Sequence, residues 1–234
     1  MCNFFSFVTD PVNHPAEYYY FDWDYRKANL DDDGADSHSH ICSHFKLNED
    51  RCNKYEFNPL TGRFDIDQIN SERDDSNAAE KWAKRQDFKT IVEPLTIKPI
   101  VNPLDLPKVE QVTDEQIGWL KDWASVGDSV RASVGDSVWD SVWASVGDSV
   151  RDSVRDSVRD SVWDSVWDSV WASVRASVWA YSSTFFAIDH KHDYSSAMKL
   201  WEAGLVPSFD GTTWRLHSGE NADIVYVWTP EVQE

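Results

Sequence analysis

Valine recurs at every fourth position from Val126 to Val178, within a tandem array that occupies residues 123–178. The array repeats one tetrapeptide fourteen times: position one is Trp, Arg or Gly, position two is Asp or Ala, and Ser and Val never change. An α-helix has about 3.6 residues per turn, so a four-residue period drifts by roughly 40° per repeat. Over fourteen repeats no apolar stripe would persist on one side of a helix. The pattern therefore argues against one long helix.

Extended structure suits the array better, because side chains alternate with a period of two and four is a multiple of two. A single flat strand of that length is excluded by the usual strand length of about 3–10 residues. We therefore predict a β-solenoid with Val inside and position one outside, built with three or four sides per coil. The predicted fold class is mainly β, with this solenoid flanked by small α+β capping segments. The alternative is a disordered low-complexity segment.

Aromatic runs and turn residues predict strands before the array. Phe4–Val8 and Tyr18–Trp23 are aromatic-rich and indicate one hairpin. Tyr55–Asn58 and Arg63–Asp67 flank the turn at residues 59–62 and indicate a second hairpin.

Helix signals and prolines follow these strands. Ser76–Phe88 is predicted to be helical with Ser76 as N-cap. The four prolines in residues 94–107 indicate an extended connector, because Pro cannot donate a backbone hydrogen bond. Thr113–Gln116 is a capping box that opens a short helix leading into the array.

After the array, Phe185–Ile188 indicates a strand and Ser195–Ala203 a helix that ends at Gly204. Residues 209–212 are a turn signal, and Trp214–Leu216 and Ile224–Trp228 are candidate strands that pair around it. The predicted segments are an N-terminal α+β segment (1–93), a Pro-rich connector with a capping helix (94–122), the solenoid (123–180) and a C-terminal α+β cap (181–234).

Several stretches together are similar to a group of uncharacterised tetrapeptide-repeat proteins of tailed phages and gut bacteria. These stretches are the opening Met1–Ser6, Asn53–Thr61, the array, Gly204–Gly211 and Trp214–His217. The resemblance implies a phage or bacterial source and carries no activity with it. The predicted architecture also resembles the β-helices of pentapeptide-repeat proteins, in principle only, since the unit here has four residues.

Charge and cysteine content narrow the functional classes. The chain carries a formal net charge of −19, which argues against general nucleic-acid or anionic-membrane binding. Three cysteines are too few for a disulfide framework and favour a reducing compartment. Residues 1–10 lack the features of a secretory signal, and no apolar run reaches the ~20 residues of a membrane span. We therefore expect the protein to be located in the cytoplasm of a bacterial host.

Two sets of residues suggest chemistry. His38, His40, Cys42 and His44 alternate, so on a strand they would share one face and offer ligands that suit Zn²⁺, with Cys52 ten residues beyond Cys42. A solvated polar segment is the alternative, because no standard finger spacing is present. Cys2 would become N-terminal if Met1 is removed, and a terminal Cys serves as a nucleophile in some hydrolases. The alternative there is a buried thiol. We assign no metal, catalytic residue or cofactor.

Position one of the repeat carries the sharper functional hypothesis. Trp and Arg are enriched at binding hot spots, and here they share one variable column of a fixed repeat. Intramolecular stacking of Trp on Arg, or cover by the flanking segments, is the alternative. We predict a non-enzymatic binding module for a protein partner, without direct nucleic-acid or membrane binding. The alternatives are an acidic mimic of nucleic acid that inhibits a DNA-binding protein and an N-terminal-cysteine hydrolase. The predicted partner-binding residues are Trp139, Trp143, Trp163, Trp167, Trp171, Arg131, Arg151, Arg155, Arg159 and Arg175.

Overall fold

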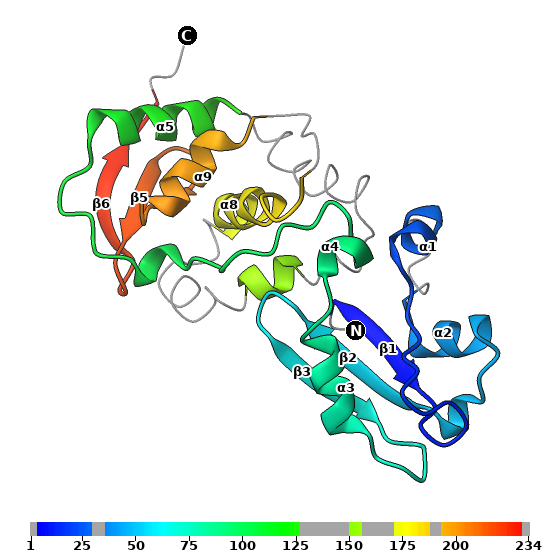
Figure 1. Cartoon of the computed structure of the whole chain (residues 1–234). Helices are drawn as coiled ribbons and strands as arrows, with labels where there is room; N and C mark the ends of the chain where they lie inside the picture. Colours follow the sequence, from blue (N-terminus) through cyan, green and yellow to red (C-terminus); the bar gives the residue numbers. More distant parts are fainter. Residues whose placement is uncertain (1–3, 30–35, 127–149, 156–170, 188–192, 231–234) are drawn as a thin grey trace. The chain divides into compact units, whose positions relative to one another are not determined.

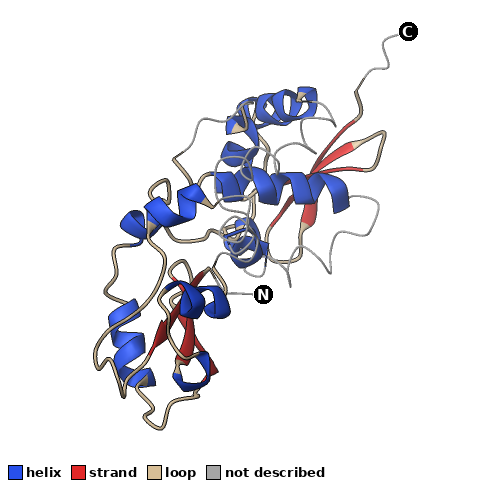
Figure 2. Cartoon of the chain, turned by 90° about the vertical axis from the view of Figure 1, so that its right-hand side faces the viewer, coloured by secondary structure: helices blue, strands red, loops and turns tan. Residues whose placement is uncertain are grey.

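The computed structural model describes residues 4–29, 36–126, 150–155, 171–187 and 193–230 (Figure 1). The described residues form two compact units. The N-terminal unit contains the chain up to Lys98 together with residues 150, 186 and 187, and the C-terminal unit contains the other residues from Pro99 onward. Each unit has one small antiparallel sheet of three strands with helices beside it (Figure 2). The units are described separately below.

The described parts of the tetrapeptide array are helical, so the prediction of a mainly β fold with a solenoid at residues 123–180 is wrong. Helix α5 (Asp114–Ser125) includes the first repeat, residues 150–155 are helical, and α8 (Trp171–Ser183) covers the last repeats. Within the described residues the only sheets are the two three-stranded ones, and neither is closed or coiled. The chain is mixed α and β, and the likeness to pentapeptide-repeat β-helices is withdrawn with the solenoid.

The error came from treating the array as one uninterrupted element. A drift of about 40° per repeat destroys a constant face over fourteen repeats, but it amounts to only about 80° across the three tetrapeptides of α8. Residues four apart then remain neighbours on one helix surface, as Val174 and Val178 do. The last two repeats also carry Ala at position two, and Ala176 and Ala180 are buried there. Ala is the best helix former and allows close packing.

The N-terminal unit contains strands β1 (Phe5–Thr9), β2 (Asn53–Asn58) and β3 (Arg63–Gln68) in that spatial order. The predicted hairpin around residues 59–62 is confirmed as the β2–β3 turn. Gly62 has φ 70° there, which Gly adopts without steric cost.

Helices cover both faces of this sheet. They are α1 (Trp23–Ala28), α2 (His38–His44), the short η1 (Glu49–Arg51), α3 (Ser76–Ala83) and α4 (Phe88–Ile91). Phe7 and Tyr55 face Trp82 of α3, with ring centroids of Phe7 and Trp82 4.9 Å apart. The opposite face packs Val8 against Ile41 and Cys42 of α2. The predicted strand at residues 18–23 is reduced to one bridge between Val8 and Tyr19.

Asp75 ties the N-terminal unit together. Its Oδ1 accepts hydrogen bonds from Thr9 Oγ1 at 3.1 Å, Asn53 Nδ2 at 2.8 Å and the Tyr55 hydroxyl at 2.6 Å. Thr9 and Tyr55 lie on neighbouring strands, whereas Asp75 directly precedes α3. One carboxylate therefore fastens the start of α3 to the sheet.

The C-terminal unit contains strands β4 (Val206–Phe209), β5 (Trp214–Ser218) and β6 (Asp223–Trp228) in that spatial order. Its helices are α5, α8 and α9 (Ser195–Glu202), together with the short η2 (Pro103–Asp105). The predicted pairing of residues 214–216 with 224–228 is confirmed, but residues 219–222 form the turn between them, and residues 210–213 join β4 to β5.

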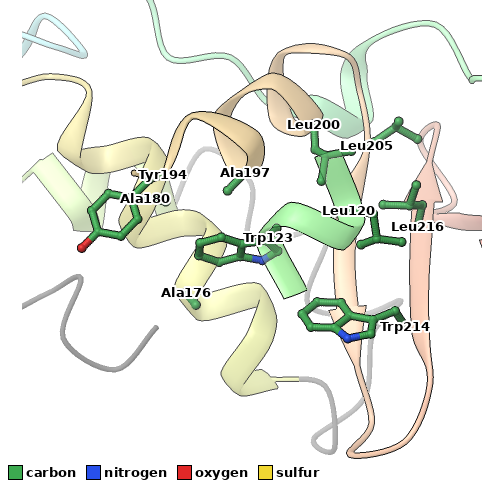
Figure 3. Packing of buried hydrophobic residues seen from close by; sticks show 10 residues of the cluster. All are labelled: Leu120, Trp123, Ala176, Ala180, Tyr194, Ala197, Leu200, Leu205, Trp214 and Leu216. Carbon is green, nitrogen blue, oxygen red and sulfur yellow. The ribbon is translucent and has the colours of Figure 1, made fainter. Parts of the chain in front are cut away.

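A buried core joins the three long helices to β5 (Figure 3). Trp123 of α5 is fully buried and lies near Ala176 of α8 and Ala197 of α9, where small side chains leave room for the indole. Leu120 and Leu216 extend the cluster to the sheet. The first and last described repeats therefore enter this core together with the segments predicted as separate caps.

Local signals in this unit are largely confirmed. Thr113 and Gln116 form the predicted capping box, and α9 begins at Ser195 as expected. Gly204 follows α9 with φ 76°. The predicted strand at 185–188 is limited, in its described part, to one bridge between Leu95 and Phe186, which both belong to the N-terminal unit.

Candidate functional site

Most of the predicted Trp/Arg column lies outside the described residues. This applies to Trp139, Trp143, Trp163, Trp167, Arg131 and Arg159, and to the side chains of Trp171 and Arg175, whose backbone belongs to α8. Arg151 and Arg155 are described. The column as a partner-binding surface therefore stays a prediction.

The two described arginines of the column make contacts within the chain. Arg151 Nη2 and Arg155 Nη1 lie 3.3 Å and 3.2 Å from Asp152 Oδ1. The Arg151 guanidinium also lies 5.6 Å from the ring centroid of Trp179, which is within cation–π range. Here an arginine of the array makes an intramolecular cation–π contact with Trp179, the residue that directly follows the array.

The alternating His and Cys residues lie on helix α2 and not on a strand. A two-residue step turns about 200° around a helix, so successive members point to opposite sides and cannot surround one ion. His40 Nε2 lies 2.6 Å from the Tyr25 hydroxyl, whereas Cys42 is buried in the core. Among the residues that the structure describes, no three His, Cys, Asp or Glu side chains are grouped to hold a metal. Cys2, the candidate terminal nucleophile, is outside the described residues.

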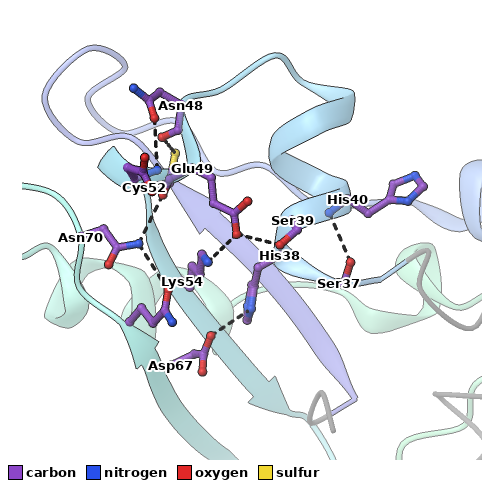
Figure 4. A network of polar contacts seen from close by, with 12 residues as sticks. Ser37, His38, Ser39, His40, Asn48, Glu49, Cys52, Lys54, Asp67 and Asn70 are labelled. Carbon is purple, nitrogen blue, oxygen red and sulfur yellow. Dashed lines mark hydrogen bonds and ion pairs between the residues drawn. The ribbon is translucent and has the colours of Figure 1, made fainter.

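A polar network joins α2 and η1 to the sheet (Figure 4). Buried Lys54 on β2 lies 2.6 Å from Glu49 Oε1, which also accepts from Ser39 Oγ at 2.7 Å. The hydrogen bond from Lys54 is the main cause that lowers the pKa of Glu49. His38 has Tyr55 O 3.0 Å from Nε2 and Asp67 Oδ2 3.3 Å from Nδ1. Lys54 and Glu49 carry opposite charges and pair with each other, and the contacts of Ser39 and His38 fasten α2 to η1 and the sheet.

A buried ion pair joins Arg26 of α1 to Asp36. Arg26 Nη2 is 2.7 Å from Asp36 Oδ1, and Arg26 Nε donates to Phe21 O at 2.9 Å. Burial raises the pKa of Asp36 to about 7, while the nearby Arg26 opposes this rise. The pair anchors α1 to the segment that precedes α2.

The C-terminal unit contains a Ser–His pair that the sequence did not indicate. Ser208 Oγ on β4 lies 2.7 Å from His217 Nε2 on β5, and His217 Nδ1 donates to Ala222 O at 3.0 Å. Such a pair could activate a hydroxyl nucleophile. However, Ser208 is 0% and His217 5% exposed, so no substrate reaches the hydroxyl. The pair fastens β4 to β5, and no short motif in the sequence marks it.

The exposed large hydrophobic side chains of this unit, among the described residues, lie on β6, one of the two edge strands of the sheet. Among the described residues β6 pairs only with β5. Ile224 and Val227 on β6 are 55% and 54% exposed. They pair with His217 and Arg215, and the irregularity between Leu216 and His217 brings both onto one face of the strand. We call residues 223–228 with this apolar face the β6 edge.

An open hollow of about 540 Å³ adjoins the start of the β6 edge, lined by Leu104, Asp105, Leu106, Pro107, Lys108, Gly219, Glu220, Asn221 and Asp223. Three of these residues are acidic and one is basic, so the hollow favours a cation. Lys108 Nζ lies 2.7 Å from Asp223 Oδ2, which raises the pKa of Lys108. Gly219 has φ 74°, and a Cβ there would lie 3.1 Å from Lys108 Cβ. Glycine therefore allows Lys108 to lie against the β5–β6 turn.

Strand β3, an edge strand of the N-terminal sheet, is better protected against pairing with an added strand. Strand β3 exposes Ile66, but three of its six residues are charged, and Arg63 pairs with Asp65 at 2.8 Å. Charged side chains on an edge discourage further strand pairing. Strand β6 carries one charged residue, Asp223, at its first position. The β6 edge is therefore the better docking surface of the two.

Comparisons with known proteins identify no relative: no family model, curated protein or solved structure matches this chain. The resemblance to phage and gut-bacterial repeat proteins stays a prediction. Among the described helices, none combines the length and the apolar character that a bilayer crossing needs.

Proposed function

We propose that this chain is a non-enzymatic protein-binding module whose β6 edge accepts an extended segment of a protein partner. The observation that carries this proposal is an edge strand with two apolar side chains that are more than half exposed and face the same way. An open edge offers unpaired backbone N–H and C=O groups to an added strand. Strand addition of this kind supplies affinity from the main chain and specificity from alternate side chains.

The partner segment that fits best is an extended peptide in which basic and apolar side chains alternate. Its apolar side chains would cover Ile224 and Val227. A basic side chain at one end would enter the hollow, where Asp105, Glu220 and Asp223 outnumber Lys108. The net charge of −19 favours encounter with a basic partner and disfavours an acidic one.

A direct test uses a fluorescent peptide of alternating Lys and Val and follows its anisotropy with the full chain. A second peptide has the same sequence but is N-methylated at alternate residues, which removes the N–H donors that strand addition needs. A third replaces Lys with Glu. We expect saturable binding of the first peptide alone.

Two variants locate the site. Val227→Lys places a like charge on the proposed docking face and should weaken binding by about tenfold or more, since tenfold corresponds to about 1.4 kcal/mol. Ile66→Lys makes the same charge change on β3 and should leave affinity unchanged. Equal binding of the methylated peptide, or equal weakening by both variants, would overturn the proposal.

A further inference from the structure

Two cysteine thiols meet inside the N-terminal unit. Cys42 lies on α2, and Cys52 directly precedes β2. Both are free thiols, and the Cys52 side chain is a hydrogen-bond partner of the Cys42 sulfur. Two thiols on different elements are thus neighbours in one buried cluster of the reduced protein.

The surroundings hold this contact in place. Both residues belong to one buried cluster with Val8, Phe21 and Ile41. The single thiol proton of Cys52 can point either to the Cys42 sulfur or to Asn48 O, which lies 3.3 Å from Cys52 Sγ, and Leu47 N donates to Cys42 O at 2.9 Å. The loop that joins the two cysteines therefore makes hydrogen bonds with both of them and holds them in one buried cluster.

The two thiols differ in acidity. The hydrogen bond from Cys52, helped by the charge of Lys54, lowers the pKa of Cys42 against the effect of burial. The same hydrogen bond, followed by burial, raises the pKa of Cys52. Since the thiolate is the nucleophile in disulfide exchange, Cys42 is suited to react first and Cys52 to react second.

We propose that Cys42 and Cys52 form a redox-active dithiol that closes to an intramolecular disulfide with a small-molecule disulfide as oxidant. The Cys42 thiolate attacks one sulfur of glutathione disulfide, forms a mixed disulfide and releases one glutathione thiolate. The Cys52 thiolate then attacks the Cys42 sulfur and releases the second. The two thiol protons pass to the two glutathiones, so the protein loses two electrons and two hydrogens while one glutathione disulfide becomes two thiols.

Closure would fasten α2 to the beginning of β2, next to the polar network around Lys54 and Glu49. The bond closes a short loop, residues 42–52, and restricts the unfolded chain more than the folded one. The oxidised N-terminal unit should therefore unfold at higher urea concentration than the reduced unit. This inference does not depend on the binding function proposed for β6.

The test refolds the full chain from urea in a glutathione redox buffer, so burial of the thiols cannot block the reaction. Remaining thiols are alkylated under denaturing conditions, and the protein is digested and analysed by mass spectrometry. We expect peptides containing Cys42 and Cys52 to be joined, with a loss of two hydrogens per chain, and Cys2 to be alkylated. The urea midpoint should fall when the sample is reduced.

Matched serine variants complete the test. Cys2→Ser should keep both the linkage and the midpoint shift, whereas Cys42→Ser and Cys52→Ser should lose both. Alkylation of all three cysteines in the unmodified chain would overturn the proposal. A linkage that includes Cys2 would overturn it as well.

Discussion

The buried Ser208–His217 pair shows how the same side chains can hold a fold or perform catalysis. Nδ1 donates to Ala222 O and therefore carries the proton of the neutral ring. Nε2 is then an acceptor, and it accepts from the Ser208 hydroxyl. This is the tautomer that a general base would need. Because neither residue is reachable from solvent, the pair contributes a hydrogen-bonded link between β4 and β5.

His217 predicts a pH dependence of the C-terminal unit. Burial lowers the pKa of His217 below its usual 6.5, so below about pH 6.5 the unfolded chain binds more protons than the folded one. The unfolding free energy should be constant above that pH and fall as the pH drops through it. Hydrogen exchange of β4 and β5 amides at pH 7.5 and 5.5, corrected for intrinsic rates, measures the change.

Two substitutions separate this cause from other titrations. His217→Gln should remove most of the pH dependence in β4 and β5, at the expense of some stability at neutral pH. His14→Gln changes an exposed histidine of the other unit and should leave the dependence as it was. A dependence that survives His217→Gln would assign it to a different group.

Residues with a local conformational role were predictable from the sequence. The capping box at Thr113 and the turn at Gly62 depend on near neighbours and on φ preference. Partners that are distant in the sequence were not predictable. Asp75 accepts a hydrogen bond from Thr9, 66 positions away, and the residues next to either one give no sign of this contact. The His and Cys alternation at residues 38–44 was misread because period two was taken as a strand signal, whereas buried Ile41 and Cys42 place α2 against the sheet.

At the scale of elements, α8 shows what a low-complexity repeat becomes when it packs. Ala176 and Ala180 belong to the core that contains Trp123, and the repeat residues Val174 and Val178 are also buried. The tetrapeptide alone does not decide between helix and strand. A repeat of four residues is close to the 3.6-residue period of a helix and is also a multiple of the two-residue period of a strand. Burial against α5, α9 and the sheet decides it.

Enlarging a packed alanine should damage this helix. Ala180→Leu adds three carbons at a fully buried position and should cost about 1–3 kcal/mol of unfolding free energy, the usual effect of overpacking. Ala78→Leu makes the same change at an exposed position of α3 and should stay within about 0.5 kcal/mol. Urea unfolding monitored by circular dichroism compares them. Equal effects would mean that α8 is not packed as described.

At the scale of the whole molecule, two units with separate sheets carry a large negative charge. The prediction of one continuous β scaffold failed here because it extended a local period across 56 residues and gave the flanks only a capping role. The flanks instead supply the strands of both sheets and most of the helices that the structure describes. What composition did convey, a large negative charge that argues against general nucleic-acid and anionic-membrane binding, does not depend on the fold.

Net charge predicts a salt dependence of the proposed binding. With −19 on the chain, association of the Lys–Val peptide should slow several-fold between about 0.05 and 0.5 M salt, while dissociation changes less. Stopped-flow anisotropy separates the two rates. A salt-independent association rate would remove charge from the account of the partner and leave only the apolar contact with Ile224 and Val227.

The most direct measurement of the proposed function is amide hydrogen exchange of the full chain with and without the Lys–Val peptide. Strand addition predicts new protection in β6 and none in β3, the exposed edge strand of the other sheet, with loss of the effect in Val227→Lys. Protection that is absent from β6, or that arises in β3 instead, would contradict the claim that β6 is the docking edge.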